Sequence, residues 1–97
     1  MTYRISRLAN SDIEAICDYV ARDNPEAADR LDLRIHSTIE MLSQFPKLGH
    51  VRKDVSADGY LFWSVGVYVI AYRMHGTQLL VVRVLHGARD FRKLFGE

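Results

Sequence analysis

Three runs of β-branched and aromatic residues in the second half of the chain constrain its fold most strongly. They cover residues 60–65, 67–74 and 79–86 and read YLFWSV, VYVIAYRM and LLVVRVLH. Gly66 separates the first two runs, and the segment HGTQ, residues 75–78, separates the second from the third. Short connections that contain glycine are typical of tight hairpin turns between antiparallel strands. The sequence therefore predicts an antiparallel meander of three strands.

The beginning of the chain predicts a short strand and a first helix. Tyr3–Leu8 alternate loosely between polar and apolar residues, which indicates the strand. The segment SDIE resembles a capping box, in which Ser11 caps the helix and Glu14 reaches back. The helix that follows should bury a stripe with spacings of three and four residues, formed by Ile13, Ile16, Cys17 and Val20.

A second helix is predicted from Pro25 to about Phe45. Asn24 is a good N-cap and Pro25 suits the first helical position, whereas Pro46 ends the helix. Its expected inner face consists of Ala28, Leu31, Ile35, Thr38, Ile39, Leu42 and Phe45. Because so few residues connect the two helices, they should form an antiparallel hairpin. Leu33 and Met41 fall outside this stripe, so they are candidates for a contact surface.

The predicted order of elements is β-α-α-β-β-β, an α+β fold. The β-branched and aromatic strands predict a small antiparallel sheet with one face covered by the N-terminal helical hairpin. Residues 46–59 show no sustained periodicity and are predicted to be a loop, and ARDFRKLF, residues 88–95, a last turn or short helix. The 97 residues fit one small domain, residues 1–97.

Several classes of protein are excluded by what the sequence lacks. It contains no apolar run long enough to span a bilayer and no signal peptide, so we expect a cytoplasmic protein without membrane contact. Cys17 is the single cysteine, and its position on an apolar stripe favours a small buried thiol over a nucleophile. The four histidines show no paired metal spacing, and no phosphate-binding loop is present. We therefore expect neither metal nor cofactor.

Charge is distributed unevenly along the chain. Residues 1–45 contain five Arg and eight acidic residues, whereas residues 46–97 contain eight basic and four acidic residues. Such an asymmetry suits a surface that meets an acidic partner or a nucleic acid.

The stretch RVLHGARDF, residues 83–91, ends the last predicted strand in a basic cluster. Metal-free RNA cleavage needs cations near the phosphate and groups that exchange protons, and histidine does so near neutral pH. In a nuclease the catalytic residues would be Arg89, His86, Arg83 and Lys53. The alternative is structural, with Arg73 and Arg83 solvated or ion-paired on their strands and His86 at the sheet edge.

Four segments resemble the RelE/ParE family of toxins from type II toxin–antitoxin systems, and in particular its ParE branch. They read DIEAICDYVARDNPEAADRL, LSQFPKLGHVR, VGVYVIAYRM and VVRVLHGARD, and together they span nearly the whole chain. The fold of that family, a small antiparallel sheet on a helical hairpin, agrees with the predicted order of elements.

The resemblance implies one of two activities. RelE-like toxins cut mRNA on the ribosome with a basic, metal-free site, whereas ParE-like toxins poison DNA gyrase and cut nothing. Arg89 matches a basic residue of the nucleases, but their strand arginine is replaced by Val69 and their C-terminal tyrosine by Phe95. A phenyl ring cannot exchange a proton. These differences favour a gyrase poison over an mRNA endonuclease, while a degenerate toxin that only binds its antitoxin stays open.

On the ParE reading the basic end is a docking surface without catalytic residues. The expected target-binding residues are Arg73, Arg83, His86, Arg89, Phe91, Arg92, Lys93 and Phe95. The resemblance also implies a ParD-like antitoxin that folds across the hairpin and sheet and forms a hetero-oligomer with the toxin. Exposed apolar residues are its expected contacts, namely Leu33, Met41 and Leu94.

Overall fold

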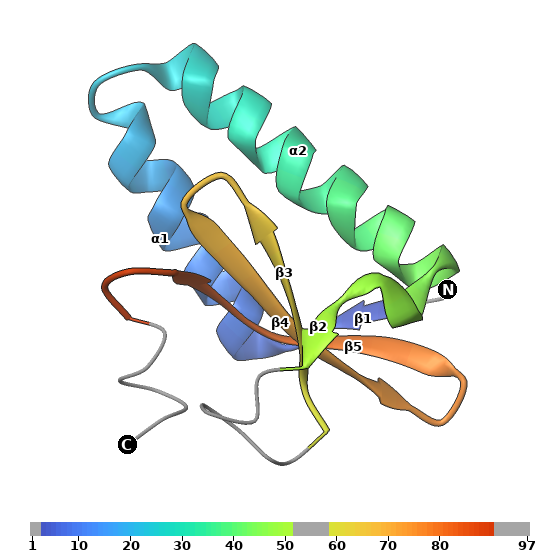
Figure 1. Cartoon of the computed structure of the whole chain (residues 1–97). Helices are drawn as coiled ribbons and strands as arrows, with labels where there is room; N and C mark the ends of the chain where they lie inside the picture. The colour runs from blue at the N-terminus through green and yellow to red at the C-terminus, as the bar shows by residue number, and fades with distance from the viewer. Residues whose placement is uncertain (1–2, 52–58, 91–97) are drawn as a thin grey trace.

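The computed structural model describes residues 3–51 and 59–90, which form two helices packed on a five-stranded sheet (Figure 1). In chain order the elements are β1 (Tyr3–Ile5), α1 (Arg7–Ala21), α2 (Pro25–Gln44), the 3-10 helix η1 (Pro46–Leu48), β2 (His50–Val51), β3 (Leu61–Val65), β4 (Tyr68–His75) and β5 (Gln78–His86). The predicted α+β fold with an N-terminal helical hairpin is confirmed. The short strand β2 lies in a segment that was predicted to be a loop.

The sheet has the strand order β1-β5-β4-β3-β2. Strands β3, β4 and β5 form the predicted antiparallel meander. Their two-residue turns place Gly66 and Gly76 at positive φ, 61° and 66°, which glycine adopts without a steric penalty. Strand β1 pairs in parallel with β5, on the side of β5 away from β4, a pairing that the sequence did not predict. As a result β5 lies inside the sheet, between the first strand of the chain and β4.

Helix α1 begins at Arg7, several residues before the predicted start. The Ser6 hydroxyl accepts a hydrogen bond from the Ala9 N–H at 3.0 Å and donates one to the Val82 carbonyl, also at 3.0 Å. The prediction that Ser11 caps the helix is therefore wrong, and the first strand ends at Ile5. The Ser6 side chain thus both caps α1 and attaches this helix to β5.

Helix α2 begins as predicted, because the Asn24 side chain accepts from the Ala27 N–H at 3.0 Å and Pro25 follows. It ends at Gln44. Phe45 was expected on the inner face, but it is the C-cap, with φ of −132°, and its residue surface is 58% exposed. Since the chain leaves the helical path there, the Phe45 ring does not continue the buried stripe.

The segment after α2 is attached to the sheet by Tyr72. This fully buried side chain donates its hydroxyl to the Pro46 carbonyl oxygen at 2.7 Å and accepts from the Gly49 N–H at 2.9 Å. A Cβ atom on Gly49 would lie 2.8 Å from Tyr72 Cε1, closer than carbon atoms approach. The glycine of the FPKLG segment is therefore needed for the tyrosine ring to fit.

The main core lies between the helices and the sheet and contains Ala9, Ile13, Ile35, Ile39, Leu42, Val65, Ile70, Tyr72, Leu79, Val81 and Val84. A bulge in β5 shapes it: Val81 pairs with Tyr72 and Arg83 with Ala71, which leaves Val82 as the additional residue. Val81 and Val84 therefore both reach the core although they are three positions apart. None of the described helices has the length and apolarity needed to cross a membrane.

Candidate target-binding groove

A groove of about 670 Å³ lies between α1 and the end of the sheet where β4 begins and β5 ends. We call it the α1–β5 groove. Its lining residues are Asp12, Ala15, Ile16, Tyr19, Arg22, Val67, Tyr68, Arg83, Val84, Leu85, His86, Arg89 and Asp90. Four of these residues lie on α1 and Arg22 is its C-cap; they recur at spacings of three and four, so they form one face of the helix. The groove thus gathers three of the predicted basic-cluster residues, Arg83, His86 and Arg89.

Arg83 is held in a bidentate ion pair with Asp12. Its Nε and Nη2 atoms donate to the two carboxylate oxygens at 2.8 and 2.9 Å, and the Val84 N–H donates to the same carboxylate at 3.0 Å. The two side chains are only 23% and 15% exposed. The hydrogen bonds with Asp12 raise the pKa of Arg83, although burial opposes the shift. The Asp12 carboxylate therefore fixes α1 to the edge of β5 and occupies the guanidinium.

His86 takes part in the turn that follows β5. Its Nδ1 atom accepts from the Arg89 N–H at 3.2 Å, and its ring meets the Tyr68 ring edge to face at 5.8 Å between centroids. A ring nitrogen that accepts a hydrogen bond has its lone pair engaged and is not free to take a proton. The nitrogen that a general base would use is thus already engaged.

Arg89 is an exposed cation of the groove. Its side chain is 69% exposed, and its Nε atom lies 3.6 Å from the Asp90 carboxylate. An ion pair at this distance between exposed groups is weak and rearranges easily. Arg89 can therefore turn toward a partner at little cost.

The other predicted basic residues lie elsewhere. Arg73 lies toward the opposite end of β4, where its guanidinium stacks over the Tyr60 ring at 5.7 Å. The remaining predicted site residues fall outside the described residues, namely Lys53, Phe91, Arg92, Lys93, Leu94 and Phe95. Within the described part of the chain, the basic cluster is therefore divided between two regions.

The sequence analysis does not identify two exposed residues that line this groove, Tyr19 on α1 and Arg22 at the C-cap of that helix. Tyr19 is 64% exposed, and the Arg22 guanidinium lies 5.9 Å from the centre of its ring. Both residues continue the helical spacing that begins at Asp12. The signal available in the sequence is a second, amphipathic stripe on the first helix, beside the fully apolar one.

Val69, at the position where the resemblance to RelE-like nucleases implies a strand arginine, lies on the sheet face away from the helices. It packs beside a small apolar cluster formed by Phe62, Ala71 and Leu85. A cation at position 69 would have to lie against this apolar surface, which is unfavourable without a partner. The apolar residue thus fits its surroundings.

Two of the predicted antitoxin contacts can be placed. Leu33 is 70% exposed on α2, in agreement with its position off the buried stripe. Met41 is only partly exposed and packs against the main core, so the expectation of an exposed side chain is wrong there. Near its C-terminal end, α2 therefore brings Met41 into contact with the core although Met41 lies outside the predicted stripe.

Metal binding has no support among the residues that the structure describes. There, no group of three or more His, Cys, Asp or Glu side chains has an arrangement that could hold an ion.

Comparisons with known proteins agree with this fold. A family model described as "ParE toxin of type II toxin-antitoxin system, parDE" matches residues 3–91. Two similar proteins of Caulobacter vibrioides are Toxin RelE2, which is 31% identical and aligned over 84% of this chain and 89% of its own length, and Toxin ParE3, which is 28% identical over 95% and 92%.

A solved structure described as "Chromosomal ParDE TA system from P. aeruginosa" has the same fold. It aligns with a TM-score of 0.74 at 24% identity and covers 89% of this chain and 95% of the other. Relatives with RelE and ParE names match at similar identity, so the choice between the two activities depends on individual residues.

Proposed function

Because the chain belongs to the family of ParE toxins of type II toxin–antitoxin systems, we propose that it inhibits growth in the cytoplasm by poisoning DNA gyrase. We further propose that a cognate ParD-like antitoxin neutralises it in a hetero-oligomeric complex. On this proposal the toxin itself cuts no nucleic acid, and the α1–β5 groove binds the target.

The observation that carries this choice is the ion pair between Arg83 and Asp12. A nuclease needs cations that are free to meet the phosphate, whereas the Arg83 guanidinium already donates two hydrogen bonds to a carboxylate. Releasing it would leave the half-buried Asp12 carboxylate without its cation. Arg83 therefore suits a structural role better than a catalytic one.

Two further features support a docking site. The Nδ1 atom of His86 accepts a backbone hydrogen bond, so it is not available to take a proton. Exposed Tyr19 and Val67 give the groove apolar and aromatic contact area beside Arg89, and this mixture of side chains is common in protein interfaces.

The first test is a supercoiling assay with purified DNA gyrase, the toxin and its antitoxin. We expect the toxin to inhibit supercoiling or to trap cleaved DNA, and the antitoxin to relieve the effect. A matched pair of variants locates the surface: Arg89→Ala should raise the toxin concentration for half-inhibition about tenfold, as loss of an interface arginine often does. Arg30→Ala, which removes an exposed arginine of α2 outside the groove, should leave it unchanged.

The competing activity is measured in parallel as ribosome-dependent cleavage of mRNA. Cleavage by the wild type, abolished by Arg89→Ala or His86→Ala while gyrase is unaffected, would refute the proposal and favour the endonuclease. If the toxin acts on neither target but binds the antitoxin, it is a degenerate member of the family.

A further inference from the structure

The β3–β4 turn, Gly66 and Val67, lies beside both helices at one end of the sheet (Figure 1). On one side, Val67 lines the α1–β5 groove together with Tyr19 of α1. On the other side, Arg34 of α2 reaches the turn, because a Cβ atom placed on Gly66 would lie 3.9 Å from Arg34 Nη1. The turn therefore joins the groove to an arginine that lies outside the groove lining.

The turn that follows β5 is held against the β3–β4 turn by the backbone. The Gly87 N–H donates to the Val67 carbonyl oxygen at 2.8 Å. A Cβ atom on Gly87 would lie 3.3 Å from that oxygen and 3.1 Å from Val69 Cγ2, so the two turns approach this closely because residue 87 is glycine. Gly87 thus fixes the position of the following segment, which carries Arg89, relative to Val67.

The two turns and both helices together present apolar and basic side chains. Val67 is 59% exposed and Tyr19 is 64% exposed, and both line the α1–β5 groove. Three exposed arginines lie next to them: Arg22 at the C-cap of α1, Arg34 on α2 and Arg89 after β5. We call these five residues the turn surface.

The arginines of the turn surface are available to a partner. Among the described residues, no ion pair involves Arg22 or Arg34. Arg89 has only the 3.6 Å contact with Asp90, which is weak between exposed groups. Because the three guanidinium groups come from different segments of the chain, they can pair with carboxylates at different points along a partner.

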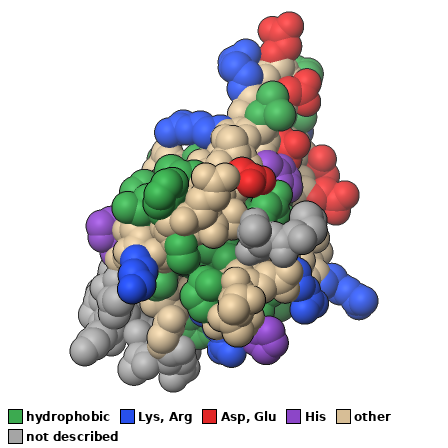
Figure 2. Space-filling model, turned by 90° about the vertical axis from the view of Figure 1, so that its right-hand side faces the viewer, with side chains coloured by type: hydrophobic (Ala, Val, Ile, Leu, Met, Phe, Trp, Pro, Cys, Tyr) green, Lys and Arg blue, Asp and Glu red, His purple; other side chains and the backbone are tan. Residues whose placement is uncertain are grey.

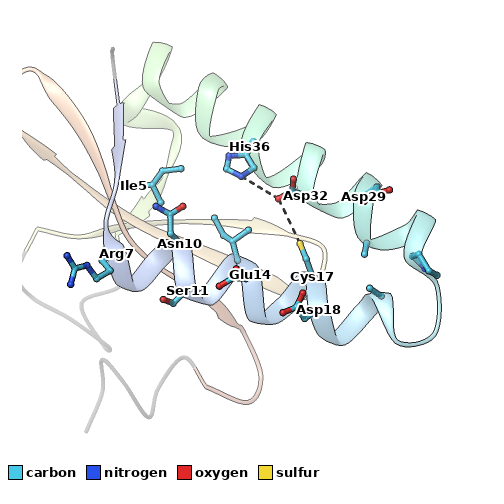
Figure 3. Close-up of a pocket in the computed structure, with 14 residues that line it drawn as sticks. Ile5, Arg7, Asn10, Ser11, Glu14, Cys17, Asp18, Asp29, Asp32 and His36 are labelled. Atoms are coloured by element: carbon cyan, nitrogen blue, oxygen red, sulfur yellow. Dashed lines mark hydrogen bonds and ion pairs between the residues drawn. The ribbon is translucent and has the colours of Figure 1, made fainter.

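Another side of the helical hairpin carries the opposite charge. Acidic side chains gather over the helical part of the face that Figure 2 shows. A pocket between α1 and α2 is bordered by Glu14 and Asp18 of α1 and by Asp29 and Asp32 of α2 (Figure 3). By helical spacing, Glu14 and Asp18 lie on the face of α1 opposite the α1–β5 groove. An acidic partner is therefore repelled from that side and attracted to the turn surface.

We propose that the turn surface binds an acidic segment of the target protein. An apolar side chain of that segment lies on Val67 and Tyr19, and its carboxylates pair with Arg22, Arg34 and Arg89. Tyrosine and arginine around an apolar centre are typical of the residues that contribute most to binding between proteins. This inference rests on the proposed action on gyrase, and it specifies that the groove contacts the gyrase protein and not its DNA.

Nucleic acid fits this surface less well. The Val67 side chain offers no hydrogen bond to a phosphate or a base edge, although such bonds hold proteins on nucleic acids. The carboxylates of Asp12 and Asp90 also line the groove, and they repel phosphate.

The apolar centre is tested by binding of the full-length toxin to purified gyrase without DNA. Val67→Ser should weaken binding about tenfold, as loss of a central interface contact often does. Leu48→Ser is the matched control, because Leu48 is a 45% exposed apolar residue of η1 outside the turn surface. This control should bind like the wild type.

The charge requirement is tested with two double variants in the same assay. Arg22→Gln/Arg34→Gln should weaken binding at least about tenfold at about 0.1 M salt, and the difference should shrink at high salt because ions screen the charges. Arg4→Gln/Arg7→Gln removes exposed arginines of β1 and of the start of α1 (Figure 3) and should leave the affinity unchanged.

A mobility-shift assay with DNA and no gyrase tests nucleic acid as the occupant. DNA binding that is lost in Arg22→Gln/Arg34→Gln but kept in Val67→Ser, without binding of gyrase alone, would overturn the inference in favour of DNA. Equal affinities for gyrase of Val67→Ser and Leu48→Ser, or of the two arginine doubles, would also overturn it.

The two proposals fail in different ways. If the toxin inhibits supercoiling and the turn-surface variants inhibit as strongly as the wild type, only the docking on an acidic segment is wrong. If the toxin neither binds gyrase nor inhibits it, both the docking and the proposed action on gyrase are wrong.

Discussion

Replacing Asp12 by Ala should destabilise the protein more than other single changes of a surface carboxylate. The carboxylate accepts hydrogen bonds at 2.8, 2.9 and 3.0 Å, from Nε and Nη2 of Arg83 and from the Val84 N–H. Its loss leaves the 23% exposed Arg83 side chain without its anion and the Val84 N–H without an acceptor. Removing one partner of a fully buried pair costs about 3–5 kcal/mol, and the residual exposure here lowers the expectation to about 3 kcal/mol.

The assay is urea unfolding, followed by far-UV circular dichroism and by the fluorescence of Trp63, the only tryptophan. A loss of about 3 kcal/mol is a large share of the roughly 5–15 kcal/mol that stabilises a typical domain. It should lower the melting temperature by roughly 12–24 °C in a chain of this size. Asp18→Ala, an exposed carboxylate of the same helix, is the control and should cost less than about 0.5 kcal/mol.

A double-mutant cycle with Arg83→Ala separates the ion pair from general effects of substitution on α1. Because both single variants break the same contact, their combined cost should fall short of the sum by at least about 1.5 kcal/mol. A cost below about 1 kcal/mol for Asp12→Ala, or a coupling near zero, would refute the structural role of Arg83. Arg83 would then return to the list of residues available to a target or a substrate.

Three further predictions follow from the cap, the buried tyrosine and the thiol. Ser6→Ala removes the cap of α1 and its link to β5. It should lower the free energy of unfolding, measured by urea titration, by about 1–2 kcal/mol, and Ser6→Thr is the conservative control. Tyr72→Phe leaves the Pro46 carbonyl and the Gly49 N–H without their partner and should cost about 1–3 kcal/mol; an unchanged unfolding midpoint would contradict this role. Burial and the carboxylates of Asp32, Asp18 and Asp29 raise the pKa of Cys17. The contribution of Cys17 to the free energy of unfolding is therefore present at pH values below the ordinary thiol pKa, and it is lost as the pH rises through the raised pKa. The pH midpoint for alkylation of Cys17 should accordingly lie above that of a free cysteine, and Asp32→Asn should lower it.

The parts of the fold that local chemistry determines could be predicted from the sequence. Asn24 and Pro25 begin α2 as expected, and Gly66 and Gly76 form the two turns of the meander. The start of α1 could not be chosen correctly, because Ser6 and Ser11 are both good caps. What decides between them is the Val82 carbonyl, 76 residues away along the chain.

The same limit applies to the candidate site. One open alternative for Arg83 was an ion-paired head group on a strand, and the structure shows that pair. Its partner, Asp12, could not be predicted, because the contact depends on the additional residue Val82 in β5 and on the pairing of β1 with that strand. Arg89, by contrast, lies three positions after the predicted strand end at His86, and its exposure could be expected from its position in the turn that follows.

The position of β5 sets the order in which a newly made chain can fold. This strand lies between β1 and β4, and it supplies Leu79, Val81 and Val84 to the main core. While the ribosome is still synthesising the residues before β5, the helical hairpin has no sheet centre to cover, and β1 has no partner strand. The sheet and the α1–β5 groove beside it can therefore form only once β5 is available, late in the making of the chain.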